Sequence, residues 1–162
     1  MSITRWPAGR IAAMCLASAL ALANASTAVA GDGKLTYARL YPGPDGVSHF
    51  STETLDFVPA GVPGVEAALA VHRLGDVKEA MLARLRAGAT EDWHTAPRRQ
   101  FMFCLRGIVE VTAGDGEKRR LRPGEFLLLE DVTGKGHRTH AAGSVDHVAL
   151  AIPLPADSPA IN

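Results

Sequence analysis

The sequence predicts an all-β protein, built as a sandwich or a barrel of short strands, and three observations lead to that prediction. Short apolar or alternating runs recur along the middle of the chain. Glycine and proline turns separate these runs. No stretch shows a convincing amphipathic helix, and many short strands without helices are typical of β-sandwiches and barrels.

The first thirty residues predict a secretory signal peptide. Arg5 and Arg10 give a positive start, residues 11–22 form an apolar run, and Ala28-Val29-Ala30 is a small-residue cleavage site. The apolar run is shorter than the ~20 residues that a membrane-spanning helix needs, which makes a membrane anchor the weaker interpretation. We therefore expect the mature protein to begin at Gly31 and to be exported, either to a periplasm or to the medium.

The mature chain is expected to form a single domain with a nearly neutral surface. Residues 31–162 number 132, the usual size of one domain. Removal of the signal leaves 15 basic and 17 acidic residues, a balance that predicts no nucleic-acid partner and no binding to an anionic membrane. Cys104 is the single cysteine that remains, so the domain has no internal disulfide and depends on its core.

Turn chemistry places the expected elements in order along the chain. A strand and turn are expected at 41–50, a short helix or loop at 65–73, and strands at 81–87, 101–105, 108–112, 126–129 and 145–152. Gly114-Asp115-Gly116 predicts a tight hairpin, and Arg122-Pro123-Gly124 predicts the next turn. Pro153 and Pro155 end the last strand, so the domain is expected to span 31–155 and a disordered tail 156–162.

Residues 93–140 resemble the two-part signature of the cupin superfamily. That signature has a His-x-His pair, then a glutamate and a glycine, and a late histidine about one strand pair further along. Laid onto this chain, its positions fall on His94, Ala96, Gln100, Gly107 and His137. The resemblance covers 91–152, is closest to small bacterial cupin-domain proteins, and implies a cupin-like jelly-roll β-barrel that is often a homodimer.

Strand alternation predicts which side chains face a pocket. If Gln100 points inward, as the family's glutamate does, then Met102 and Cys104 point inward with it, while Phe101 and Phe103 pack on the other face. By the same alternation Asp92, His94 and Ala96 are in phase with Gln100, provided that Pro97 does not interrupt the strand, and His137 shares a face with Thr139. Arg98 and Arg99 could clamp a carboxylate at the mouth. The expected ligand pocket is His94, Gln100, Met102, Cys104, His137, Arg98 and Arg99.

The resemblance also implies a metal site formed by His94, Gln100 and His137. Such a donor set would suit one divalent transition metal: Fe, Zn, Ni, Mn or Cu. Gln100 is a neutral ligand where the family has a carboxylate, and Ala96 offers none, so an empty polar pocket is the favoured interpretation. Glu130 or Asp131 could supply the missing charge if the loop before His137 folds inward.

Three functions remain open at this point, and the sequence leaves open whether the protein is an enzyme. The first is an exported module that binds a small organic ligand, such as an organic acid, in its barrel. The second is a metal-dependent oxygenase or isomerase that uses His94 and His137. The third is a structural domain with a vestigial site. We expect alanine at either histidine to leave folding intact, and Phe103→Ala to cost about 3–5 kcal/mol if Phe103 is fully buried. His147 is interpreted as isolated, and Cys104 as a buried, inert thiol.

Overall fold

The computed structural model describes residues 29–30, 34–61, 63, 70–74 and 77–156. The predicted signal segment 1–28, most of the predicted helix or loop at 65–73 and the tail 157–162 lie outside the described residues. Every regular element within the described residues is a β-strand, so the all-β prediction is confirmed. Among these residues no helix is long and apolar enough to cross a membrane.

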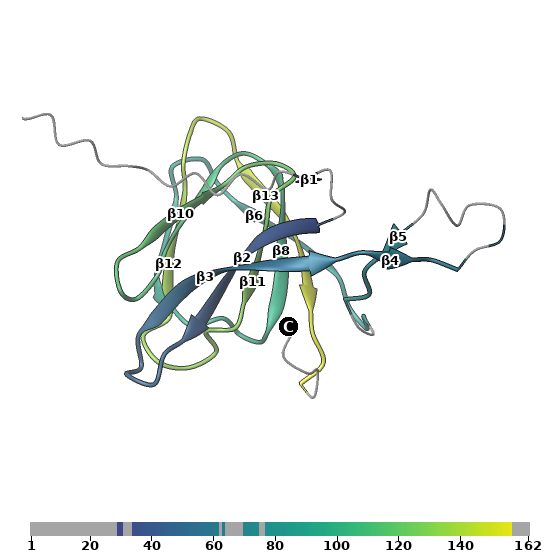
Figure 1. Cartoon of the computed structure of the whole chain (residues 1–162). Coiled ribbons are helices and arrows are strands. Elements are labelled where there is room, and N and C mark those ends of the chain that lie inside the picture. The colour runs from purple at the N-terminus through teal and green to yellow at the C-terminus, as the bar shows by residue number, and fades with distance from the viewer. Residues whose placement is uncertain (1–28, 31–33, 62, 64–69, 75–76, 157–162) are drawn as a thin grey trace, which may run out of the picture.

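Thirteen strands follow one another along this part of the chain (Figure 1). They are β1 Val29–Ala30, β2 Lys34–Pro42, β3 Ser48–Asp56, β4 Val58–Pro59, β5 Ala70–Val71, β6 Met81–Leu85, β7 Thr90–His94, β8 Gln100–Arg106, β9 Val109–Thr112, β10 Lys118–Leu121, β11 Phe126–Leu129, β12 His137–Ala141 and β13 His147–Pro153. The predicted turns at 114–116 and 122–124 lie between strands, and the predicted turn that begins at Pro42 starts on the last residue of β2. The expected short helix or loop at 65–73 is wrong for residues 70 and 71, which form β5 and pair with β4.

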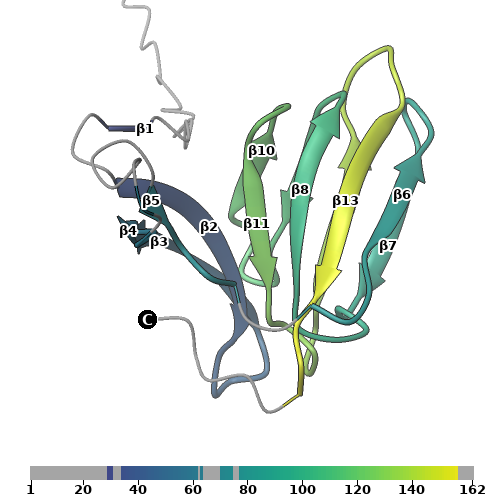
Figure 2. The same ribbon diagram turned by 90° about the vertical axis from the view of Figure 1, so that its right-hand side faces the viewer.

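The strands assemble into two main sheets and one small hairpin. The larger sheet has the order β1-β2-β11-β8-β13-β6, with β3 also paired to β2, and the second sheet has the order β10-β9-β12-β7. Figure 2 shows β11, β8, β13 and β6 side by side, with β2 and β3 leaning away from them. The β2–β11 pair is parallel and joins two segments that are far apart in the chain.

The main core lies between the two sheets. Leu40, Cys104 and Leu129 come from the larger sheet, and Val111 and Leu121 come from the smaller one. All five are buried in one apolar cluster, which holds the sheets face to face. This arrangement places the inward side chains of β8 between the sheets, where a pocket was expected.

A second, aromatic cluster covers the opposite face of the larger sheet. Phe101 and Phe126 are buried there with Tyr37, and the Tyr37 and Phe126 rings stack with centroids 5.1 Å apart. Phe103 also packs against this cluster but is only partly buried. The predicted alternation along β8 is therefore confirmed, and the N-terminal strands together with Leu154 cover its outer face.

Candidate functional site

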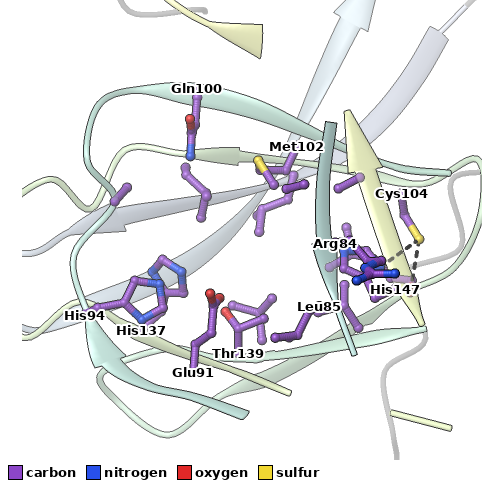
Figure 3. A pocket seen from close by; sticks show the side chains of 18 of the residues that line it. Arg84, Leu85, Glu91, His94, Gln100, Met102, Cys104, His137, Thr139 and His147 are labelled. Carbon is purple, nitrogen blue, oxygen red and sulfur yellow. Dashed lines mark hydrogen bonds between the residues drawn. The ribbon is translucent and has the colours of Figure 1, made fainter. Parts of the chain in front are cut away.

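A cavity of about 340 Å³ opens between the two sheets. Part of its wall is the main core itself, and the histidine pair with Glu91 gathers at one end (Figure 3). The apolar lining residues include Ala96, Met102, Val109, Val111, Leu121, Leu127, Leu129 and Ala149, and the polar ones include Glu91, His94, Gln100, His137 and Thr139. The cavity therefore has an apolar body and a polar end.

His94 and His137 form the centre of the polar end. They are directly opposed across the β7–β12 pair, and their ring centroids lie 4.4 Å apart. Gly136 allows this approach: its φ is +72°, and a Cβ there would lie 2.0 Å from the His94 carbonyl oxygen. Only glycine fits such a position without moving the backbone, so the sequence Gly136-His137 fixes the histidine pair.

Each histidine ring is held through its Nδ1 atom. His94 Nδ1–H donates to the Asp92 carbonyl oxygen at 2.6 Å, since a carbonyl can only accept. His137 Nδ1 lies 2.6 Å from Asp131 Oδ2, and the Nδ1–H donates a hydrogen bond to this carboxylate. In the neutral imidazoles the remaining nitrogen, Nε2, then carries a lone pair. Both rings are thus fixed in the same tautomer, with an acceptor at Nε2.

Asp131 supports the site from behind. It is fully buried, and its Oδ1 atom has no hydrogen-bond partner within the described part of the chain. The loop before His137 does fold inward, as the missing charge would require. Glu130, however, is occupied elsewhere: Arg39 Nε donates to one of its oxygens, and Arg99 donates to the other at 2.5 and 2.8 Å. Asp131 therefore supplies the charge next to the histidines.

The expected anion clamp is not formed, because neither arginine lines the cavity. Arg99 is paired with Glu130, and Arg98 makes an exposed ion pair with Glu79 at 3.1 Å. The other five predicted pocket residues line the cavity: His94, Gln100, Met102, Cys104 and His137. Arginine side chains reach far from the backbone, so their position could not be read from strand phase.

Glu91, and not Asp92, joins the site. His94 pairs with His137 and Glu91 pairs with Thr139, so two residues of β7, Asp92 and Trp93, oppose one residue of β12. This β-bulge brings a side chain three positions before His94 onto the cavity face. Figure 3 shows the Glu91 carboxylate turned towards the histidine rings. Simple alternation predicted Asp92, and the irregular step in the strand is the reason for the difference.

Gln100 contributes a polar group whose oxygen is unpaired. Its side chain is 7% exposed, and among the described residues its Oε1 atom has no hydrogen-bond partner. Figure 3 shows the amide entering the cavity from the strand opposite the histidines. The oxygen itself is covered by protein atoms, and Figure 3 shows the amide nitrogen, a hydrogen-bond donor, on the side that faces the cavity.

Cys104 and His147 face each other at another part of the cavity wall. The Cys104 Sγ atom lies 3.7 Å from His147 Nδ1 and 3.5 Å from the Gly107 carbonyl oxygen. Burial raises the pKa of the thiol to about 11, and burial also lowers the pKa of His147. A protonated thiol beside a neutral imidazole is a poor nucleophile. His147 is thus not isolated, as its place in the sequence suggested, while Cys104 is buried as expected.

The donors at the polar end do not complete a metal site of the expected kind. Within the described residues no three His, Cys, Asp or Glu side chains gather closely enough to hold an ion. His94 and His137 give two imidazoles, and the third expected ligand, Gln100, offers a neutral amide oxygen. Catalytic zinc sites use three protein ligands of stronger donor character, so the residues present fall short of that set.

Comparison with known proteins identifies the domain. A family profile described as "Cupin domain" matches residues 81–153. No curated protein matches the chain. Among similar solved structures is a Cupin 2 conserved barrel domain protein from Salinispora arenicola CNS-205, with 16% sequence identity and a TM-score of 0.40, in a match over 48% of this chain and 62% of that chain. The DMSP lyase DddQ from Ruegeria pomeroyi DSS-3 has 20% identity and a TM-score of 0.40, over 49% of this chain and 40% of that chain. KdgF from Halomonas sp. has 29% identity and a TM-score of 0.36, over 48% of this chain and 70% of that chain. The chain spans less than two thirds of the first two.

Proposed function

The chain belongs to the cupin superfamily, and from that premise we propose that it is an exported protein which holds a small organic molecule in the cavity between its sheets. We also infer that the two facing sheets are the walls of a jelly-roll barrel. In this proposal the protein binds its ligand without chemically changing it. Fold alone does not fix function, so the argument rests on the site.

The cavity itself is the observation that supports binding most directly. It brings a few polar side chains, Glu91, His94, Gln100 and His137, to one wall-lined space that a small molecule can enter. The surrounding wall is apolar, with Met102, Val111 and Leu127 among its residues. A cavity of about 340 Å³ lies in the range of small-molecule sites, which combine an apolar body with a few placed polar groups.

Thermal-shift screening of metal-free protein tests this proposal. Purified protein treated with EDTA would be screened against amines, alcohols, sugars and organic acids, because a ligand that binds only the folded state raises Tm. We expect at least one class to raise Tm, and Gln100→Leu to reduce that shift while the protein remains folded. If no compound stabilises the protein unless metal is added first, the binding proposal is wrong.

A metal-dependent enzyme, an oxygenase or an isomerase, is the second proposal. The observation that favours it is that the Nδ1 atoms of His94 and His137 both make hydrogen bonds to oxygen atoms. Histidines that bind metal through one ring nitrogen commonly donate a hydrogen bond from the other nitrogen to a carboxylate or a carbonyl oxygen. Metal analysis of the protein as isolated, followed by reconstitution, tests it. Less than about a tenth of an equivalent of any transition metal, with no uptake on addition, would exclude this function.

Export is a separate part of the proposal and has its own test. The positive start, the apolar run and the Ala28-Val29-Ala30 sequence support removal of the first thirty residues. N-terminal sequencing of protein recovered from the periplasm or the medium of a bacterial host should then begin at Gly31. Uncleaved protein that remains in the cytoplasm would contradict export.

A further inference from the structure

The polar end of the cavity presents hydrogen-bond acceptors. The Nε2 atoms of His94 and His137 are acceptors in the neutral rings, because both Nδ1 atoms already donate. Glu91 adds a carboxylate. Three side chains from β7 and β12 thus offer acceptor atoms on one side of the cavity, where Figure 3 shows them near one another. A molecule bound there has to bring donors.

The charge at this end is negative. Glu91 lines the cavity, and the buried carboxylate of Asp131 touches His137 from behind. Arg99 does not offset this charge, because its guanidinium group is paired with Glu130. Among the described residues the cavity lining includes one cationic side chain, Arg84, which Figure 3 places beside His147, away from the histidine pair. Arg84 itself is largely exposed and lies 3.7 Å from Asp146.

We propose that the ligand is an organic cation, an amine whose ammonium group meets Glu91 and the histidine pair while its apolar body fills the rest of the cavity. This inference rests on the proposed binding function and names its ligand class. An ammonium group supplies up to three donors and a positive charge, which match the acceptors and the negative charge found here. The proposal replaces the organic acid that the sequence suggested.

A carboxylate ligand meets the opposite situation. Its oxygens carry lone pairs and no proton at neutral pH, so they cannot donate to the Nε2 atoms of neutral rings. It would also lose hydration beside Glu91 and Asp131 without gaining a counter-charge. Discrimination between ligands arises from such mismatches as much as from favourable contacts. The cavity should therefore select the amine over an acid that has the same apolar body.

Three compounds that share a phenyl body and differ in the polar group test this inference: 2-phenylethylamine, 2-phenylethanol and phenylacetate. Isothermal titration of EDTA-treated protein should show the amine binding about tenfold or more tighter than the carboxylate, with the alcohol between them. Glu91→Gln keeps the side-chain shape and removes the charge, and should weaken amine binding about threefold or more while leaving the alcohol unchanged. Glu79→Gln, an acid outside the cavity, is the matched control and should change neither.

The outcomes separate this inference from the proposal beneath it. If phenylacetate or phenylethanol binds as tightly as the amine, the cation assignment is wrong and the binding function stands. If none of the three binds and the wider screen also finds no ligand, the binding function itself fails. If Glu91→Gln and Glu79→Gln have the same effect on amine binding, Glu91 does not contact the ligand and the assignment fails. Both variants should have the same urea midpoint as the unmodified protein, which excludes loss of folding as the reason for any change in amine binding.

Discussion

Replacement of His137 by alanine should destabilise the fold much more than replacement of His94. His137 is 3% exposed, and its partner Asp131 is 0% exposed. The two side chains are joined by the 2.6 Å contact between His137 Nδ1 and Asp131 Oδ2. Since Asp131 Oδ1 has no partner among the described residues, alanine at 137 would leave a fully buried carboxylate without any side-chain donor. This differs from the sequence-based expectation that both substitutions leave folding intact.

The size of the effect follows from the cost of an unpaired buried charge. Breaking a buried pair by removing one partner costs about 3–5 kcal/mol. His94 is partly exposed and loses only a hydrogen bond to a backbone carbonyl, for which about 1 kcal/mol is expected. The difference between the two variants should therefore be about 2–4 kcal/mol, well above the error of equilibrium unfolding.

Urea unfolding of metal-free protein at neutral pH measures both values. Asp131→Ala and the double variant with His137→Ala complete a double-mutant cycle, in which the double variant should cost clearly less than the sum of the single ones. If His137→Ala costs no more than His94→Ala, the carboxylate is relieved by water or by a shift of the loop, and the reasoning from burial is refuted. Additive single variants would refute the coupling of Asp131 to His137.

Three further predictions concern the core, the thiol and a surface histidine. Phe101→Ala should cost about 3–5 kcal/mol in urea unfolding, because Phe101 is 0% exposed, and Phe103→Ala should cost less, because Phe103 is only partly buried. The pKa of Cys104 is raised to about 11 in the folded protein, so the thiol ionises at lower pH in the unfolded chain. The free energy of unfolding should therefore fall as pH rises from about 9 to 11. In Cys104→Ala the urea midpoint should fall less over this pH range. The hydrogen bond to Asp115 raises the pKa of His49, so its stabilising effect is present at low pH and disappears as pH rises through the raised pKa; NMR titration should show that pKa falling in Asp115→Asn.

Local sequence signals predicted five of the strands between residues 81 and 153, namely β6, β8, β9, β11 and β13, but did not mark β7, β10 and β12. Alternation along β8 correctly separated the cavity-facing Met102 and Cys104 from the outward Phe101, because a strand has a fixed two-residue period. Glycine and proline turns located the hairpins for the same local reason. The parallel pairing of β2 with β11 was not predicted, since it depends on a contact between segments far apart in the chain.

The candidate site was predicted in part, and its omissions have physical causes. His94, Gln100 and His137 line one cavity because the motif places them on facing strands. Asp131 was foreseen only as a conditional source of charge, because loop folding cannot be read from strand phase. His147 was treated as isolated, although its contact with Cys104 arises across the β8–β13 pair, where a shift in register brings the two side chains together.

The bulge in β7 also makes the site tolerant of a change in chain length. Glu91 and His94 are three residues apart, whereas a regular strand would place two residues of the same face at an even separation. Deletion of Trp93 would therefore convert the segment to a regular ladder and keep Glu91 and His94 on the cavity face. β12 has no extra residue at this point, so deletion of Arg138 would turn either His137 or Thr139 away from the cavity. An acid at an odd distance before a histidine is thus a pattern worth seeking in similar chains, where even spacing alone would miss it.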